Sequence, residues 1–215
     1  MNQDAPTRPS LLLQIREPAN HAAWEAFVRI YAPLIHGYCR RHELQDADAA
    51  DVAQEVMRSV MTAIRRFEYD PGRGSFRGWL LTVTRNKVNT FLGARARRPQ
   101  PASESTLLAR IEAPNGATEE DRWDADYRQR LFEWACDKAR QEIKPATWQA
   151  FSLTALDNQS AEEASAATGL SAGAVYVARS RVTARLRELL RSVADDPPEL
   201  LPGLPQCPDA FRQSN

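Results

Sequence analysis

Apolar residues recur every three or four positions along most of this chain, which is the spacing of an α-helix with one buried face. Asn20 is a suitable N-cap for a first helix, and Pro33 is expected to start a second helical piece. Residues 46–67 then predict a long helix and residues 76–94 another, with a turn-rich loop at 68–75 between them. Almost no strand signal is present, so the pattern predicts an all-α protein.

The helical pattern continues in the second half of the chain. It resumes near Trp123, stops at residues 143–145 and returns over residues 147–156. Two further helices follow within residues 160–191, which read SAEEASAATGLSAGAVYVARSRVTARLRELLR. The second half therefore predicts a small module of four helices.

Five segments are expected from these patterns. Two small helical domains, 20–98 and 125–192, are joined by a flexible linker at 99–124 that is rich in proline and acidic residues. The N-terminus, 1–19, contains three prolines and is expected to be loose. The tail, 193–215, is also proline-rich and is expected to be disordered.

Residues 160–191 have the local signals of a helix-turn-helix. Ser160 and Glu163 fit a capping box, which marks a helix start. Gly169 supplies a turn, and Ser171 can cap the helix that follows. These signals predict a short helix, a tight turn and a long second helix.

The second of these helices has one apolar face and one basic face. At 100° per residue the apolar positions are Val175, Ala178, Val182, Leu186 and Leu189. The opposite side carries Tyr176, Val177, Ser180, Ala184, Arg187 and Arg191, with Arg181 and Arg185 flanking it. A basic surface helix on a bundle is the plain alternative, but capping, turn and face pattern together favour a helix that contacts DNA.

Composition is compatible with this all-α prediction, and it argues against membrane proteins, secreted proteins and metal-binding proteins. The chain is 43% hydrophobic and 26% charged, which is ordinary for a soluble globular protein. No apolar run is long enough to cross a bilayer and no signal-peptide core is visible, so a cytoplasmic location is expected. Cys39 and His42 are spaced like two metal ligands, but no second pair exists, and a helix-surface Cys and His is favoured. The sequence therefore predicts no cofactor and no metal.

Charge is distributed unevenly, although the net charge is +0. That net charge is low for a protein that binds DNA by itself, because phosphate neutralisation dominates such affinity. Residues 85–98 and 172–191 are basic, whereas residues 103–126 between them are acidic. This distribution suggests two DNA-contacting modules and a linker.

One face of the predicted 46–67 helix is polar, opposite its apolar face. It presents Asp48, Asp51, Gln54, Glu55 and Arg58. Three interpretations compete: a solvated helix face, carboxylate metal ligands, and a surface that docks on another protein. Metal ligation is disfavoured because no His joins the carboxylates at helical spacing.

Aromatic and basic residues are mixed between residues 67 and 92. Aromatic rings can stack on unpaired bases, and cations hold the backbone. Arg85, Asn86 and Asn89 share one side of the helix and suit base-edge hydrogen bonds. For Phe76 and Trp79, a core position is the favoured interpretation over nucleic-acid contact.

Three segments in order resemble the bacterial extracytoplasmic function (ECF) sigma factors, the initiation subunits of RNA polymerase. They are DADAADVAQEVMRSVMTAIRRF, SFRGWLLTVTRNKVNTFL and GLSAGAVYVARSRVTARLREL. The resemblance covers about residues 20–95 and 125–191. It implies that 20–98 is sigma region 2, a helical bundle, and that 125–192 is region 4, the helix-turn-helix bundle.

The resemblance also implies a role for each set of residues. Core RNA polymerase would be contacted, at the clamp helices of its largest subunit, by Asp48, Asp51, Gln54, Glu55 and Arg58, and the polymerase flap is a further expected partner surface. The −10 element would be recognised and melted by Tyr69, Arg73, Phe76, Arg77, Trp79, Arg85, Asn86, Lys87 and Asn89. The −35 element would be read by Ser171, Ala174, Tyr176, Val177, Ser180, Arg181, Ala184 and Arg185. Many relatives are also held by an anti-sigma factor, which is a further candidate partner.

Two other classes of function are weighed against a sigma factor. An autonomous helix-turn-helix regulator, with its N-terminal half as an effector or dimerisation domain, would bind an operator tightly by itself. An enzyme would need a nucleophile–base pair or a metal cluster, and neither is convincing in this sequence. The sequence therefore predicts a non-enzymatic factor that selects promoters, and its Tyr176-Val177 pair departs from the more basic or serine-containing run of many relatives.

Overall fold

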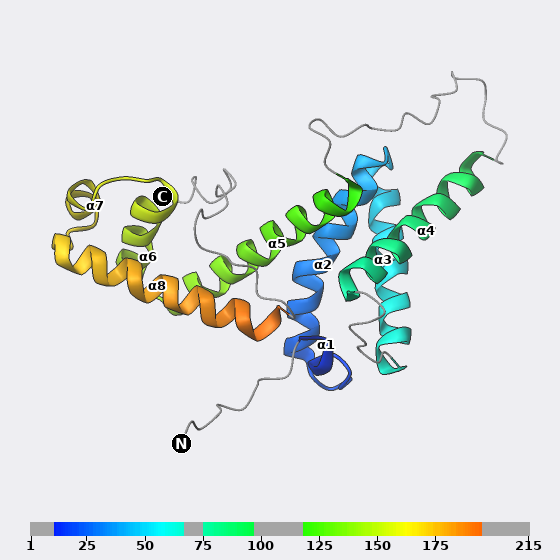
Figure 1. Ribbon diagram of the computed structural model, residues 1–215, viewed down its shortest axis with the longest axis horizontal. Helices are drawn as coiled ribbons and strands as arrows, with labels where there is room; N and C mark the ends of the chain where they lie inside the picture. The colour runs from blue at the N-terminus through cyan, green and yellow to red at the C-terminus, as the bar shows by residue number, and fades with distance from the viewer. Residues whose placement is uncertain (1–10, 67–74, 97–117, 195–215) are drawn as a thin grey trace. The chain divides into compact units, whose positions relative to one another are not determined.

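The computed structural model describes residues 11–66, 75–96 and 118–194. Within these ranges the regular secondary structure is entirely helical (Figure 1), which confirms the all-α prediction. The described residues form two compact units. The N-terminal unit comprises residues 27–127, and the C-terminal unit comprises residues 11–26 together with 128–194.

The N-terminal unit is built from α2 (His21–Arg41) from Phe27 onward, α3 (Asp46–Ala63), the short 3₁₀ helix η1 (Ile64–Arg66), α4 (Phe76–Ala96) and the start of α5 (Glu119–Glu142). Figure 1 shows α3 and α4 lying side by side, and the two helices are in contact. The fully or nearly fully buried side chains of this unit include Phe27, Ile30, Leu34, Ile35, Val52, Val56, Val60, Leu80 and Val88. They are the apolar positions of each helix, so one helical face per element forms the core.

Two expectations for α2 have different outcomes. The Asn20 side chain accepts a hydrogen bond of 3.1 Å from the Ala23 N–H, which confirms it as a helix cap. The expected break at Pro33 is wrong, because α2 continues through it. A proline inside a helix removes one backbone hydrogen bond. Here the residues on both sides of it, Tyr31 and Leu34, are buried in the core, and this packing holds the helix together.

The C-terminal unit contains the remainder of α5 with α6 (Pro145–Phe151), the π-helical turn η3 (Ser152–Leu156), α7 (Ala161–Thr168) and α8 (Ala172–Val193). Pro145 occupies the start of α6, where its missing N–H costs nothing. The break predicted at residues 143–145 is therefore present, and α6 begins two residues before the predicted position.

The N-terminal segment needs a correction. Residues 11–19 are not loose, since α1 (Leu11–Gln14) is helical and Leu11, Leu12 and Ile15 are buried. The Gln14 side chain also donates a hydrogen bond of 3.5 Å to the backbone oxygen of Ser192 in the same unit. The flanking prolines suggested a flexible segment, but the short apolar cluster outweighs them. Residues 1–10, most of the predicted linker and the tail from 195 lie outside the described residues.

Candidate nucleic-acid interface

The turn between α7 and α8 has the geometry that its sequence predicts. The Ser160 hydroxyl accepts from the Glu163 N–H at 3.2 Å, and the Glu163 carboxylate accepts from the Ser160 N–H at 2.8 Å. Gly169 ends α7 with φ of 70°, in the left-handed region where glycine is unstrained. Ser171 then caps α8 by accepting from the Ala174 N–H at 3.3 Å. The capping box, the turn and the second cap are all confirmed.

Small side chains hold this helix-turn-helix together. Ala150 of α6, Ala161 and Ala164 of α7, and Val175 and Ala178 of α8 form one buried cluster. Short side chains let the three helices approach closely, and Leu153 and Leu170 pack against the cluster. The five apolar positions predicted for α8 are all buried, and the opposite face is therefore the one available to a partner.

Most of the residues predicted to contact the −35 element lie on that accessible face. Tyr176 and Val177 are 63% and 58% exposed, which is unusual for large apolar side chains and suits a binding surface. Ser180, Arg181 and Ala184 are also exposed. Within the described residues Arg181 takes part in no hydrogen bond or ion pair, so its guanidinium is available to a phosphate or a base edge.

Arg185 differs from Arg181, since it already has partners. Its guanidinium contacts the two Glu142 oxygens at 2.6 and 3.0 Å and a Glu188 oxygen at 2.8 Å. The hydrogen bond to Glu142 is the main reason that the pKa of Arg185 is raised above its ordinary value. Two other residues predicted to contact the −35 element are less available. The Ser171 hydroxyl caps α8, and Ala174 is half-buried.

The polar side of α4 carries the second predicted set. Asn86 and Asn89 are exposed and point away from the core residues of this helix. Lys87 donates a hydrogen bond of 3.0 Å to Glu55 of α3, so it links two helices of the unit. The helix thus presents amides freely, while its cations have partners inside the protein.

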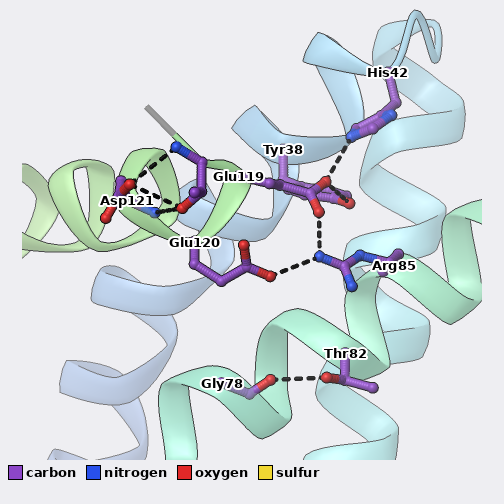
Figure 2. A network of polar contacts seen from close by, with 9 residues as sticks. Tyr38, His42, Gly78, Thr82, Arg85, Glu119, Glu120 and Asp121 are labelled. Atoms are coloured by element: carbon purple, nitrogen blue, oxygen red, sulfur yellow. Dashed lines mark hydrogen bonds and ion pairs between the residues drawn. The ribbon is translucent and has the colours of Figure 1, made fainter. Parts of the chain in front are cut away.

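Arg85 of α4 lies at the centre of a polar network (Figure 2). Its guanidinium contacts the Glu119 carboxylate and a Glu120 oxygen, the latter at 3.1 Å. The same Glu119 carboxylate accepts from the Tyr38 hydroxyl at 2.6 Å and lies 3.4 Å from His42 Nε2. Tyr38 of α2, His42 just after α2 and Arg85 of α4 therefore converge on one acid at the start of α5.

This network shifts the proton affinities of its members. Burial raises the pKa of Glu119, but hydrogen bonds from Tyr38 and Arg85, together with the charges of Arg85 and His42, lower it overall. Burial and the bond to Glu119 raise the pKa of the Tyr38 phenol. Both shifts favour a charged Glu119 and a neutral Tyr38 at neutral pH.

Arg77, another predicted DNA contact, also has interaction partners within the protein. Its Nε donates to Asp124 at 3.1 Å, and its guanidinium lies 4.8 Å from the centre of the Tyr127 ring. Burial lowers the pKa of Arg77, but the charge and hydrogen bond of Asp124, together with Tyr127 and Tyr31, raise it overall. Both partners belong to the first turns of α5, as do those of Arg85.

The aromatic residues of the predicted −10 set have separate outcomes. Phe76 is only 2% exposed and contacts the rings of Phe27, Tyr31 and Trp79. Its place in the DNA-contacting set is therefore corrected: it is a core residue, since stacking on a base would require it to leave the core. Trp79 is half-buried. Tyr69 and Arg73 lie outside the described residues.

The polar face predicted for α3 is present. Asp51, Gln54, Glu55 and Arg58 are exposed, and Asp48 is half-buried. Glu55 is paired with both Lys87 and Arg58, at 3.0 and 3.2 Å, and the bond from Lys87 is the main cause of its lowered pKa. Asp51 and Gln54 have no hydrogen bond or ion pair among the described residues, so they are the members most available to a partner.

A metal site at Cys39 and His42 receives no support from the geometry. The described part of the chain contains no cluster of three or more His, Cys, Asp or Glu side chains that could hold an ion. Cys39 is fully buried, and burial raises the pKa of its thiol to about 11, which disfavours the thiolate that a metal needs.

The residues that sequence reasoning missed are those of α5 from Glu119 to Tyr127. The predicted linker ran to residue 124, whereas α5 begins at Glu119. Its acidic residues suggested a solvated segment. The signal that could have identified the helix is Trp123 and Tyr127, four residues apart, behind an acidic first turn.

Comparisons with known proteins agree with this geometry. Residues 27–98 match the family model of sigma-70 region 2. The chain is 30% identical over 178 residues to the RNA polymerase sigma factor CarQ of Myxococcus xanthus, covering 82% of this chain and 94% of that protein. It is 34% identical over 169 residues to the ECF RNA polymerase sigma factor SigD of Mycobacterium tuberculosis, covering 76% of this chain and 74% of that protein. None of the helices in the described ranges is long and apolar enough to span a membrane.

Proposed function

Because this chain belongs to the ECF family of RNA polymerase sigma factors, it binds core RNA polymerase and directs promoter-specific initiation, and we propose which surfaces carry each step. The C-terminal unit reads the −35 element through the exposed face of α8. Tyr176 and Val177 meet base edges, with Val177 suited to a thymine methyl, and Arg181 binds a phosphate or a base. This exposed face, next to a correctly capped turn, is the observation that carries the proposal.

The N-terminal unit contacts the −10 element through α4. The exposed Asn86 and Asn89 hydrogen-bond bases of the melted strand in this proposal, and Arg85 and Lys87 bind its backbone. Trp79 is the half-buried ring that stacks on a base in this arrangement. Tyr69 and Arg73 belong to the same proposed surface on the strength of the sequence alone.

The polar face of α3 docks on the polymerase. Asp51 and Gln54 are its central contacts, since they are exposed and free of partners within the described residues, and Asp48, Glu55 and Arg58 border them. On this proposal the factor is not an enzyme and acts in the bacterial cytoplasm, where its polymerase works. An anti-sigma factor would cover the same faces.

The neutral net charge is consistent with this division of labour. A protein of net charge +0 gains little from sequence-independent attraction to DNA. A sigma factor takes most of its affinity from the core enzyme, so neither of its DNA surfaces has to bind tightly alone.

Transcription on two templates tests the assignment of α8. Arg181→Ala is expected to lower initiation about tenfold on a duplex promoter, because one phosphate or base contact is lost. On a template opened beforehand around the −10 element, the loss should be smaller. Arg140→Ala, which removes an exposed arginine from α5, is the matched control. An equal loss on both templates, or a loss as large for the control, would count against this role of α8.

A further inference from the structure

The start of α5 occupies the arginines through which the N-terminal unit is proposed to bind DNA. Glu119 and Glu120 hold Arg85, and Asp124 holds Arg77. A carboxylate offers a guanidinium two oxygens in a plane, much as a phosphate does. The acids of α5 therefore take positions that backbone phosphates would need.

Apolar contacts fix this segment on the unit. Trp123 and Tyr127 are 1% and 3% exposed. The Trp123 ring packs edge-on against Tyr38 with 5.8 Å between ring centres, and the Tyr127 ring stacks on Tyr31 at 5.5 Å. The two residues lie on the same side of α5, so the helix is docked by its apolar face while its acids reach the arginines.

The docked arrangement leaves one polar group unsatisfied. The Trp123 indole N–H is buried and has no hydrogen-bond partner within the described residues. A buried donor without a partner opposes docking, because water would satisfy it if the segment moved away. The contact is thus held by charge and ring packing and opposed by this group, which suits a segment that can be released.

We propose that residues 119–127, here called the acidic latch, are an autoinhibitory contact that replaces DNA phosphate on Arg77 and Arg85 in the free protein. The inference rests on the proposed role of α4 in DNA binding. Being part of the same chain, the latch acts at a high effective concentration, so single-stranded DNA must displace it before α4 can bind. Weak DNA binding by the free protein follows from this competition as well as from its net charge.

The affinity of the free, full-length protein for DNA tests the latch. The probe is a fluorescein-labelled single-stranded oligonucleotide of mixed sequence, followed by fluorescence anisotropy at several salt concentrations. Glu119→Gln with Glu120→Gln is expected to raise affinity about fivefold, as for the loss of two half-exposed ion pairs. The salt dependence should steepen by about 0.7 for each additional phosphate bound.

Two controls separate the latch from a simple change in net charge. Asp137→Asn with Glu162→Gln removes two exposed acids elsewhere and should change affinity much less. Adding Arg85→Ala to the latch variant should abolish the gain. An unchanged affinity, a gain equal to that of the control pair, or a gain that survives Arg85→Ala would each overturn the proposal.

Tyr38→Phe provides a second variant in case the double substitution impairs folding. It removes only the hydroxyl that holds Glu119, in a buried site where phenylalanine fits, and a smaller gain in affinity is expected. Failure of the latch can be told from failure of the −10 assignment. If Arg85→Ala lowers promoter melting with core polymerase while the latch variants bind DNA like wild type, the latch alone is wrong. If Arg85→Ala changes neither promoter melting with core polymerase nor the gain in DNA affinity of the latch variant, the assignment of α4 to the −10 element fails.

Discussion

Asp51→Arg is expected to weaken the binding of core RNA polymerase while leaving the fold unchanged. Asp51 is exposed and has no partner among the described residues, so its replacement should alter the free energy of unfolding by no more than about 0.5 kcal/mol. The proposed docking pairs Asp51 with a cation of the polymerase, so the reversal removes one attraction and adds one repulsion. At about 4 Å in water each is worth about 1 kcal/mol. A total of about 2 kcal/mol corresponds to a dissociation constant about thirtyfold higher.

Glu55→Arg is a less informative change on the same face. Glu55 holds Lys87 of α4 and Arg58, so its reversal would also disturb the contact between α3 and α4. Any loss of core binding could then come from the fold. Asp51 separates the two effects because only an external partner is affected.

Titration of labelled protein with purified core polymerase measures the effect of Asp51→Arg, and circular dichroism checks the fold. Asp137→Arg is the matched control, since it reverses an exposed acid in α5. A core affinity for Asp51→Arg equal to that of the control would refute the docking role of α3.

Three further outcomes concern stability. Ser160→Ala should lower the free energy of unfolding of the C-terminal unit by about 1 kcal/mol in urea titrations, because the capping box with Glu163 is lost. Arg185→Ala should lower it by about 0.5 kcal/mol, since the contacts with Glu142 are partly exposed, and a stability equal to wild type would show that these contacts contribute nothing. The pKa of Glu119 is lowered in the folded protein, so its contribution is present above its ordinary value of about 4.3 and lost as pH falls. Thermal melts should therefore show a larger loss on acidification for wild type than for Glu119→Gln.

Much of the C-terminal unit could be predicted from sequence because its signals are local. The capping box of Ser160 and Glu163 spans four residues, and the turn at Gly169 needs only one glycine in the left-handed region. The buried face of α8 follows from helical spacing alone. Each of these features depends on residues close together in the chain.

The contacts of Arg85 could not be predicted in this way. Its partner Glu119 lies 34 residues away, and no local pattern joins them. The prediction of a helix break at Pro33 was wrong for the opposite reason. The local signal for a break was clear, but core packing on both sides of Pro33 outweighs the lost backbone hydrogen bond. Local rules thus identified the helices, whereas the ion-pair partners of their charged side chains depend on tertiary structure.

As a sigma factor, this chain gives core polymerase its choice of promoter. Transcription in vitro with purified core, the full-length protein and genomic DNA, with mapping of the 5′ ends of the transcripts, tests it most directly. We expect specific start sites that share two sequence elements at a constant spacing, and with Asp51→Arg the same starts should require a correspondingly higher concentration of the protein. Absence of core binding and of specific starts, together with tight binding of the isolated protein to an operator, would contradict it and favour an autonomous regulator.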